Sequence, residues 1–240
     1  LPLGKVDPGL RAPETPLDLA AVGRDAKLVE DLGYDALMVE ETKDDPFVVM
    51  ALAAQATETL RLGTAVAISF PRSPTSMALS AWSIQKLSRG RFTLGLGPQV
   101  RAHIERRYGM ATSPAGPWMR DYRLNLMVPL FDPGPIEHPD IPVHVAAVNT
   151  VMCRIAGEVA DGIRPHPVCT PSYIRQVMLP SVRAGAAKTG RSLENFSVSM
   201  KPLIAAAPDE ETLRTRVRDA RARIAFYAST PAYRAAFAHL

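Results

Sequence analysis

The chain has 240 residues, of which 47% are hydrophobic and 22% are charged, and its formal net charge is +4. These values are typical of a soluble globular protein. The sequence contains no apolar run as long as a membrane span, no signal-peptide pattern at its start and no basic-aromatic pattern typical of nucleic-acid binding. Its two cysteines lack metal or redox spacing. We therefore expect a cytoplasmic protein with a small-molecule substrate and without a nucleic-acid or membrane partner.

Strands and helices alternate along the first half of the chain, which predicts a parallel sheet. Apolar residues at close to helical spacing predict a first helix over 17–32, and Gly33 is placed to end it. A buried strand over 35–41 follows and ends in two carboxylates. The next elements expected are a helix over 47–59, a strand over 60–69, a helix over 75–87 that Ser73 caps, and a strand over 91–96.

The pattern is looser in the middle of the chain. Residues 99–117 are polar and contain Pro and Gly, which predicts an active-site loop. A crossover helix is expected after it, but the sequence between 118 and 135 is hard to assign. The remaining elements expected are a strand over 141–148, a helix over 149–159, a short strand over 161–166, a helix over 172–185, a strand over 195–204 and a helix over 209–227.

About seven βα units result if the N-terminal residues complete a first strand, which is close to the number in a (β/α)₈ barrel. A parallel barrel must close to remove its edges. We therefore expect residues 1–240 to form one TIM-type barrel domain, and we expect missing residues near 122/123 and after Leu240.

The segment from Leu87 to Gly97 is the most informative part of the chain. A helix ends at its start, and the strand that follows closes on Gly95 and Gly97. Glycine at the C-terminal end of a strand lets a flat ligand approach the backbone. In barrel and doubly wound α/β folds, the chemistry takes place at that end of the strands.

Other strand ends carry residues that could serve a site. Glu41 could orient a cofactor or move a proton at the barrel mouth, or could be an ordinary charge before a helix. The small residues from Gly63 to Phe70 would leave room for a ring, or belong to a plain buried strand. Backbone N–H groups near Asn149 and Thr150 could bind a phosphate, or Asn149 could simply cap the helix.

The positions of the histidines argue against a metal site. The five histidines lack metal-ligand spacing, so no metal is expected. His166 lies at a strand end and could reach a substrate, although a hydrogen-bonded structural role is the simpler interpretation. The sequence also lacks a G-x-S-x-G elbow and a complete dinucleotide-binding fingerprint.

Five blocks, taken in order, resemble one family. They are Asp31–Asp35, Leu62–Ala65, Gly90–Gly97, Pro142–Ala147 and Ala156–Gly162. The chain resembles the luciferase-like monooxygenase superfamily, and within it most closely the branch that depends on the deazaflavin coenzyme F420. The resemblance implies a TIM-type barrel that holds the cofactor at its C-terminal mouth.

The resemblance also implies roles for individual residues. A non-prolyl cis peptide behind the cofactor ring is expected at Ala65–Val66 or one residue on. Glu41 stands where the family often has a histidine or an acidic residue, and becomes the catalytic candidate. Gly97 and Pro98 would border the cofactor tail. The cofactor-binding loop, with its phosphate contacts, would comprise Ala146, Ala147, Val148, Asn149 and Thr150.

The function that follows from the resemblance is hydride transfer between coenzyme F420 and an unknown organic substrate. Arg101, Arg106 and Arg107 would favour F420, because its tail is acidic. One alternative is an FMN-dependent luciferase-like monooxygenase, and another is a non-catalytic flavin-binding protein on the same barrel. A homodimer is the expected assembly.

Overall fold

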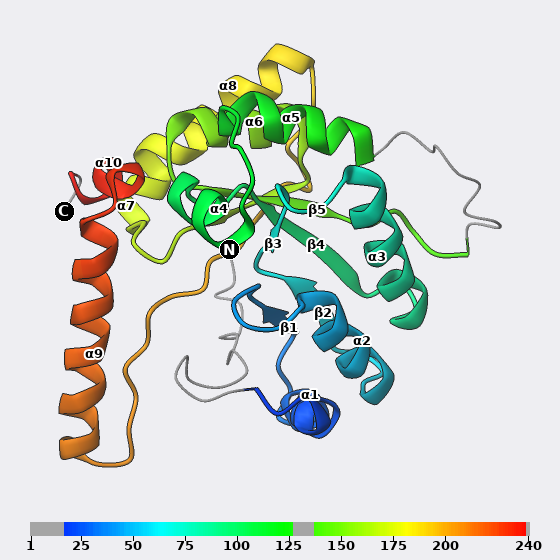
Figure 1. Cartoon of the computed structure of the whole chain (residues 1–240), viewed down its shortest axis with the longest axis vertical. Helices are drawn as coiled ribbons and strands as arrows, with labels where there is room; N and C mark the ends of the chain where they lie inside the picture. Colours follow the sequence, from blue (N-terminus) through cyan, green and yellow to red (C-terminus); the bar gives the residue numbers. More distant parts are fainter. Residues whose placement is uncertain (1–16, 127–136, 239–240) are drawn as a thin grey trace.

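The computed structural model describes residues 17–126 and 137–238. Its strands all pair in parallel in one curled sheet of order β1-β2-β4-β5-β6-β7, with β3 beside β4 (Figure 1). The strands are β1 (Ala36–Val39), β2 (Arg61–Thr64), β3 (Ala67–Ile68), β4 (Phe92–Gly97), β5 (Val143–Ala147), β6 (Gly162–Pro165) and β7 (Ser197–Val198). The predicted parallel α/β barrel class is confirmed.

Most helices lie around the outside of this sheet, whereas α9 stands apart from it (Figure 1). The helices are η1 (Leu19–Ala21), α1 (Val22–Asp31), α2 (Pro46–Ala56), α3 (Pro74–Leu87), α4 (Arg101–Tyr108), α5 (Ala115–Leu126), α6 (Thr150–Val159), α7 (Pro171–Tyr173), η2 (Ile174–Met178), α8 (Leu179–Thr189), α9 (Glu210–Ala228), η3 (Pro231–Tyr233) and α10 (Arg234–Phe237). In the part of the chain that the structure describes, no helix has both the length and the apolar content to cross a bilayer.

Alternation along the strands separates two faces of the sheet. Leu37, Leu62, Leu94 and Val145 are fully or almost fully buried in the core shared with the surrounding helices. Their sequence neighbours point to the opposite, concave face, which is lined by Gly63, Gly95, Gly97 and Gly162 together with Met38, His144, Ala146 and Arg164. The concave face is therefore poor in large apolar side chains.

The strand expected over 60–69 is divided in two. The peptide bond between Ala65 and Val66 is cis, and these two residues separate β2 from β3. Beside them, the Thr64 side chain replaces backbone pairing with β4: its Oγ1 accepts a hydrogen bond from the Gly95 N–H (2.9 Å) and donates one to the Gly95 carbonyl (2.7 Å). The strand consequently bulges at Ala65–Val66.

Two expectations are corrected by the structure, and a third element is located. The expected crossover helix is α5, which contains residues 122 and 123. The strand expected over 195–204 is reduced to β7, which pairs on one side only, with β6. Residues 101–108 of the expected loop form α4. Among the described strands β1 and β7 do not pair, so the barrel is not closed by backbone hydrogen bonds there, and the N-terminal strand that was expected lies outside the described residues.

Candidate active site

The C-terminal ends of the strands bring three predicted site residues together. A Cβ added to Gly97 would lie 2.6 Å from Cγ2 of Val66 and 3.3 Å from Cβ of Ala146. Both neighbours remain partly exposed, whereas Gly97 is buried. Val66, Gly97 and Ala146 therefore form a continuous surface of small apolar groups at the barrel mouth, here called the apolar floor.

The next strand places a cation beside this floor. Arg164 on β6 is in register with Ala146 on β5. Its guanidinium donates to Oγ of Ser199 (3.2 Å) and reaches Sδ of Met38 on β1 (3.2 Å). The mouth thus has an apolar half formed by β3 to β5 and a cationic half beside β6.

Below the floor, His144 occupies the concave face of β5. Its side chain lies against Gly162, and the residue is only 8% exposed. Burial, and after it the positive charge of Arg164, lowers the pKa of His144 to about 4. At neutral pH this imidazole is therefore uncharged.

Glu41 lies beside the mouth in an ion-pair network. Its Oε2 accepts a hydrogen bond from the Ile68 N–H (2.8 Å), and Arg72 donates to both carboxylate oxygens (2.8 and 2.6 Å). Tyr108 on α4 donates to Oε1 (3.3 Å). The carboxylate therefore fixes the chain that follows β3, and burial together with Glu41 raises the pKa of Tyr108.

The predicted phosphate loop forms a conventional helix start. Asn149 caps α6, since its Oδ1 accepts a hydrogen bond from the Met152 N–H (3.0 Å). Tyr173 donates a hydrogen bond to the Val148 carbonyl (2.9 Å), and Ala147 is buried in the core. Thr150 is exposed as the first residue of the helix. These contacts hold the base of the loop, and the first N–H groups of α6 have no partner within the helix.

His166 follows β6 but is enclosed by the C-terminal helices. Its ring stacks on Tyr233 (centroids 4.3 Å apart) and meets Tyr227 edge-on (4.5 Å). Burial lowers the pKa of His166 to about 4. The side chain therefore acts as an aromatic anchor for α9 and η3 in this structure.

These two histidines predict a loss of stability in mild acid. Each has a folded-state pKa near 4 against an unfolded value of 6.5, so below pH 6.5 the unfolded chain binds more protons. We expect the free energy of unfolding to fall as the pH drops from 6.5 toward 4, and to be about 2 kcal/mol lower at pH 5 than at pH 7.5 for each histidine. Denaturant unfolding at pH 7.5 and 5 would measure this. His166→Phe keeps the ring stack and should reduce the loss, and an unchanged loss would contradict the assignment to His166.

Helix α4 carries the three arginines of the expected loop. Ile104 anchors it in a small cluster with Ile68 and Phe70. Arg107 donates to the Thr42 carbonyl after the end of β1, and Arg101 pairs with Glu105 (2.7 Å). α4 therefore lies across the strand ends beside the mouth and is already held in place.

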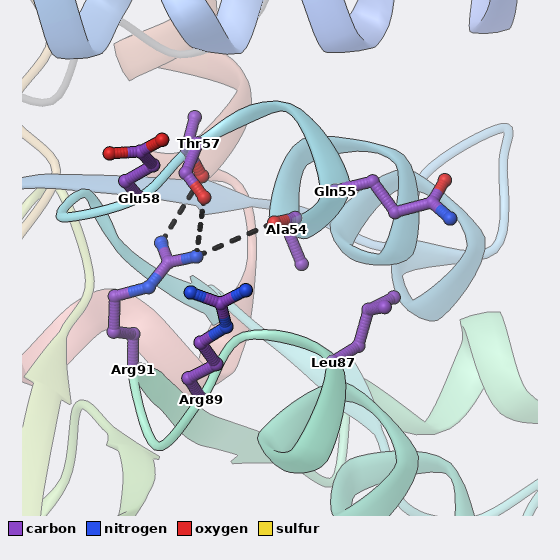
Figure 2. Close-up of a pocket in the computed structure, with 7 residues that line it drawn as sticks. All are labelled: Ala54, Gln55, Thr57, Glu58, Leu87, Arg89 and Arg91. Atoms are coloured by element: carbon purple, nitrogen blue, oxygen red, sulfur yellow. Dashed lines mark hydrogen bonds between the residues drawn. The ribbon is translucent and has the colours of Figure 1, made fainter.

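Two surface hollows lie away from the mouth. One, of about 310 Å³, is between the C-terminal ends of α2 and α3, where Arg91 donates to Oγ1 and the carbonyl of Thr57 (Figure 2). It opens at the N-terminal ends of the strands, a face associated with stability rather than chemistry in barrels. The other, about 450 Å³, is between α5, α6 and α8. Among residues 17–126 and 137–238, no three potential metal ligands gather.

Comparison with known proteins agrees with this geometry. The family model described as luciferase-like monooxygenase matches residues 3–239. The chain belongs to this family. An uncharacterised protein of Mycobacterium tuberculosis is 35% identical over 243 residues, which cover 91% of this chain and 72% of that relative.

The relatives whose names state an activity are less similar in sequence, and for some of them the match covers a smaller share of the relative. A second Mycobacterium tuberculosis protein, provisionally named a coenzyme F420-dependent oxidoreductase, is 31% identical over 79% of this chain and 62% of its own. The coenzyme F420-dependent tetrahydromethanopterin reductase of Methanopyrus kandleri has a similar structure (TM-score 0.75, 20% identity, 94% of this chain and 73% of that one). So does the oxygenating constituent of 3,6-diketocamphane monooxygenase from Pseudomonas putida, in complex with FMN (TM-score 0.62, 15% identity, 79% and 64%).

The luciferase-like resemblance predicted the position of the cis peptide, and the structure confirms it at Ala65–Val66. Arg164 and Arg72 are the residues that sequence reasoning missed. An arginine inside a short parallel strand, as Arg164 is, was a signal that could have been used, since such strands are normally apolar. Arg72 lies in a loop, where one more cation gives no such signal.

Proposed function

We propose that this luciferase-like protein is an oxidoreductase that transfers a hydride between coenzyme F420 and an organic substrate. The observation that carries the proposal is the apolar floor of Val66, Gly97 and Ala146 at the C-terminal mouth of a barrel of this family. The name of the 31% identical mycobacterial relative favours F420 over FMN. This chain covers only 62% of that relative's length, so the substrate has to be found by experiment.

The residues present fit a flat redox ring. A Cβ at Gly97 would overlap Cγ2 of Val66 (2.6 Å) and touch Cβ of Ala146 (3.3 Å), so glycine keeps the floor low at this point. The N–H groups at the start of α6, beside Asn149 and Thr150, would hold a phosphate. Pro98 follows Gly97 directly and would border the cofactor tail, and Arg106 is exposed on α4, where it would meet an acidic group.

When bound at this mouth, a deazaflavin would supply a ring carbon that accepts or donates hydride. Val66, Gly97 and Ala146 would support one face of the ring and exclude water from it, which would leave the opposite face to the substrate. Glu41 holds Ile68 and Arg72 rather than the floor itself, and it would serve the reaction by fixing the bulge that carries Val66. His166 would reach a substrate only if the C-terminal helices moved away from it.

Titration of the purified protein with F420 and with FMN, each monitored by fluorescence or absorbance, tests the proposal. Tighter binding of F420, followed by reduction or oxidation of the bound cofactor with a screened substrate, is expected. Tighter binding of FMN with oxygen consumption would favour the monooxygenase, in line with the FMN complex of the structural neighbour. Binding without turnover of any screened substrate would favour a flavin-binding protein.

Glu41→Gln is expected to lower turnover more than cofactor affinity. The neutral amide weakens two charge-assisted bonds from Arg72, which should also lower the free energy of unfolding by about 2 kcal/mol. The pH profile of kcat/KM separates two roles for the carboxyl. If the variant loses one of the pH-dependent slopes of this profile, Glu41 acts as an acid or base. If the shape of the profile is unchanged, Glu41 acts by positioning other residues. Unchanged turnover and stability would contradict both.

The homodimer stays a prediction. Its physical support is an exposed apolar surface on the neighbouring helices α2 and α3. Helix α2 carries no charged residue and its Val48 is 49% exposed, and Leu79 on α3 is 51% exposed. Sedimentation analysis of the wild type and of Leu79→Lys would test it. A monomeric wild type would contradict the expectation.

A further inference from the structure

We propose that Arg164 provides the positive charge that favours the reduced, anionic form of the bound ring cofactor. The inference rests on the proposed function, because it assumes that a deazaflavin or flavin ring lies on the apolar floor. It holds for either cofactor. It concerns which redox state the site prefers, which the family assignment leaves open.

Strand register places Arg164 in the same layer as the floor. Leu96 pairs with Val145, so Gly97 lies beside Ala146, and Ala146 pairs with Arg164. The three strand ends therefore present glycine, alanine and arginine in sequence around the mouth. The arginine is partly exposed, and its strand neighbour in this layer is Ala146 of the floor.

A glycine makes room for this guanidinium. A Cβ on Gly95, one layer below the floor, would come within 2.8 Å of Nε of Arg164. The side chain thus lies inward over β4 rather than outward toward solvent, and the hydroxyl of Ser199 (3.2 Å) and Sδ of Met38 (3.2 Å) hold its end. After burial, the same charge is the second cause that lowers the pKa of His144 on the neighbouring strand.

The chemistry gives this charge a role. A hydride carries two electrons and one proton, so a ring that accepts a hydride alone gains one negative charge. Before any further proton is bound, the reduced ring therefore carries one more negative charge than the oxidised ring. A fixed cation within a few ångströms therefore stabilises the reduced state selectively, by much more than in water, because the mouth is shielded on one side. A charge near the ring is one of the means by which proteins tune redox cofactors.

A purely structural role is the competing explanation. Arg164 connects β6 to β1 through Met38 and to the chain after β7 through Ser199. In the described part of the sheet, β1 and β7 do not pair with each other. If this were its whole purpose, loss of the charge would weaken the fold or the binding of both redox states alike. The ratio of the two affinities separates the explanations.

The experiment measures dissociation constants of oxidised and chemically reduced cofactor for wild type, Arg164→Gln and Arg164→Lys, with F420 and with FMN. Arg164→Gln removes the charge and keeps a donor for Ser199, Arg164→Lys keeps the charge, and Ser199→Ala is the control that removes a contact only. Thermal unfolding followed by circular dichroism confirms that each variant is folded.

Wild type is expected to bind the reduced form more tightly than the oxidised form. Arg164→Gln should reduce that preference about tenfold, which corresponds to a midpoint potential about 30 mV lower for a two-electron couple. Arg164→Lys should retain most of the preference, and Ser199→Ala should leave it unchanged.

Two outcomes would overturn the proposal while leaving the proposed function intact: equal changes in both affinities on loss of the charge, or a wild type that binds the oxidised form at least as tightly. The second outcome is measured on the wild type alone, so the proposal can be overturned even if Arg164→Gln does not fold. A wild type that binds neither cofactor in either state would overturn the proposed function and this inference together.

Discussion

Replacing Ala146 with leucine is expected to abolish cofactor binding while the fold is retained. Ala146 is partly exposed on the apolar floor, and its Cβ lies 3.3 Å from the position of a Cβ on Gly97. A leucine side chain would therefore project into the space that the ring needs, because the neighbouring strands pack too closely to take it up. We expect at least about a hundredfold weaker binding, equivalent to about 3 kcal/mol.

Titration with F420 and FMN measures this effect, and denaturant unfolding checks the fold. The free energy of unfolding should change by less than about 1 kcal/mol, since position 146 is partly exposed rather than in the core. Ala187→Leu is the matched control, because Ala187 is exposed on the outer helix α8 and should leave binding unchanged. Wild-type affinity in Ala146→Leu would place the cofactor elsewhere.

Gly95→Ala is expected to destabilise the protein severely. The added Cβ would overlap the carbonyl oxygen of Thr64 and come within 2.8 Å of Nε of Arg164. Neither strand can move freely, because the Thr64 hydroxyl bonds both the N–H (2.9 Å) and the carbonyl (2.7 Å) of Gly95. A clash with backbone cannot be relieved by changing a rotamer, so we expect a loss of about 3 kcal/mol or more.

Equilibrium unfolding in urea measures this loss, and Gly109→Ala provides the comparison. Gly109 ends α4 with a φ of 63°, and among the described residues no heavy atom lies within 4 Å of the position that a Cβ would take there. Its substitution should cost only the left-handed backbone penalty, about 1 kcal/mol. If Gly95→Ala were no more destabilising than Gly109→Ala, the close approach of β2 and β4 would be wrong.

Local signals in the sequence were sufficient for the order and type of most elements. Ser73 and Asn149 cap their helices as predicted, and Gly33 ends α1 with a φ of 77°. These features depend on hydrogen bonds and backbone conformation within a few residues, so they are visible without tertiary context. Family resemblance added the cis peptide at Ala65–Val66, because a bulge there is tied to recognisable blocks of sequence.

The tertiary structure alone decided what the charged and aromatic side chains do. Glu41 meets Arg72, Arg164 crosses the concave face to Met38, and His166 is covered by the C-terminal helices. Each contact joins residues far apart in the chain, and strand register and helix packing bring them together. Periodicity predicts which face of an element a side chain occupies, but not which partner stands opposite, and at this barrel mouth the partner determines the chemistry.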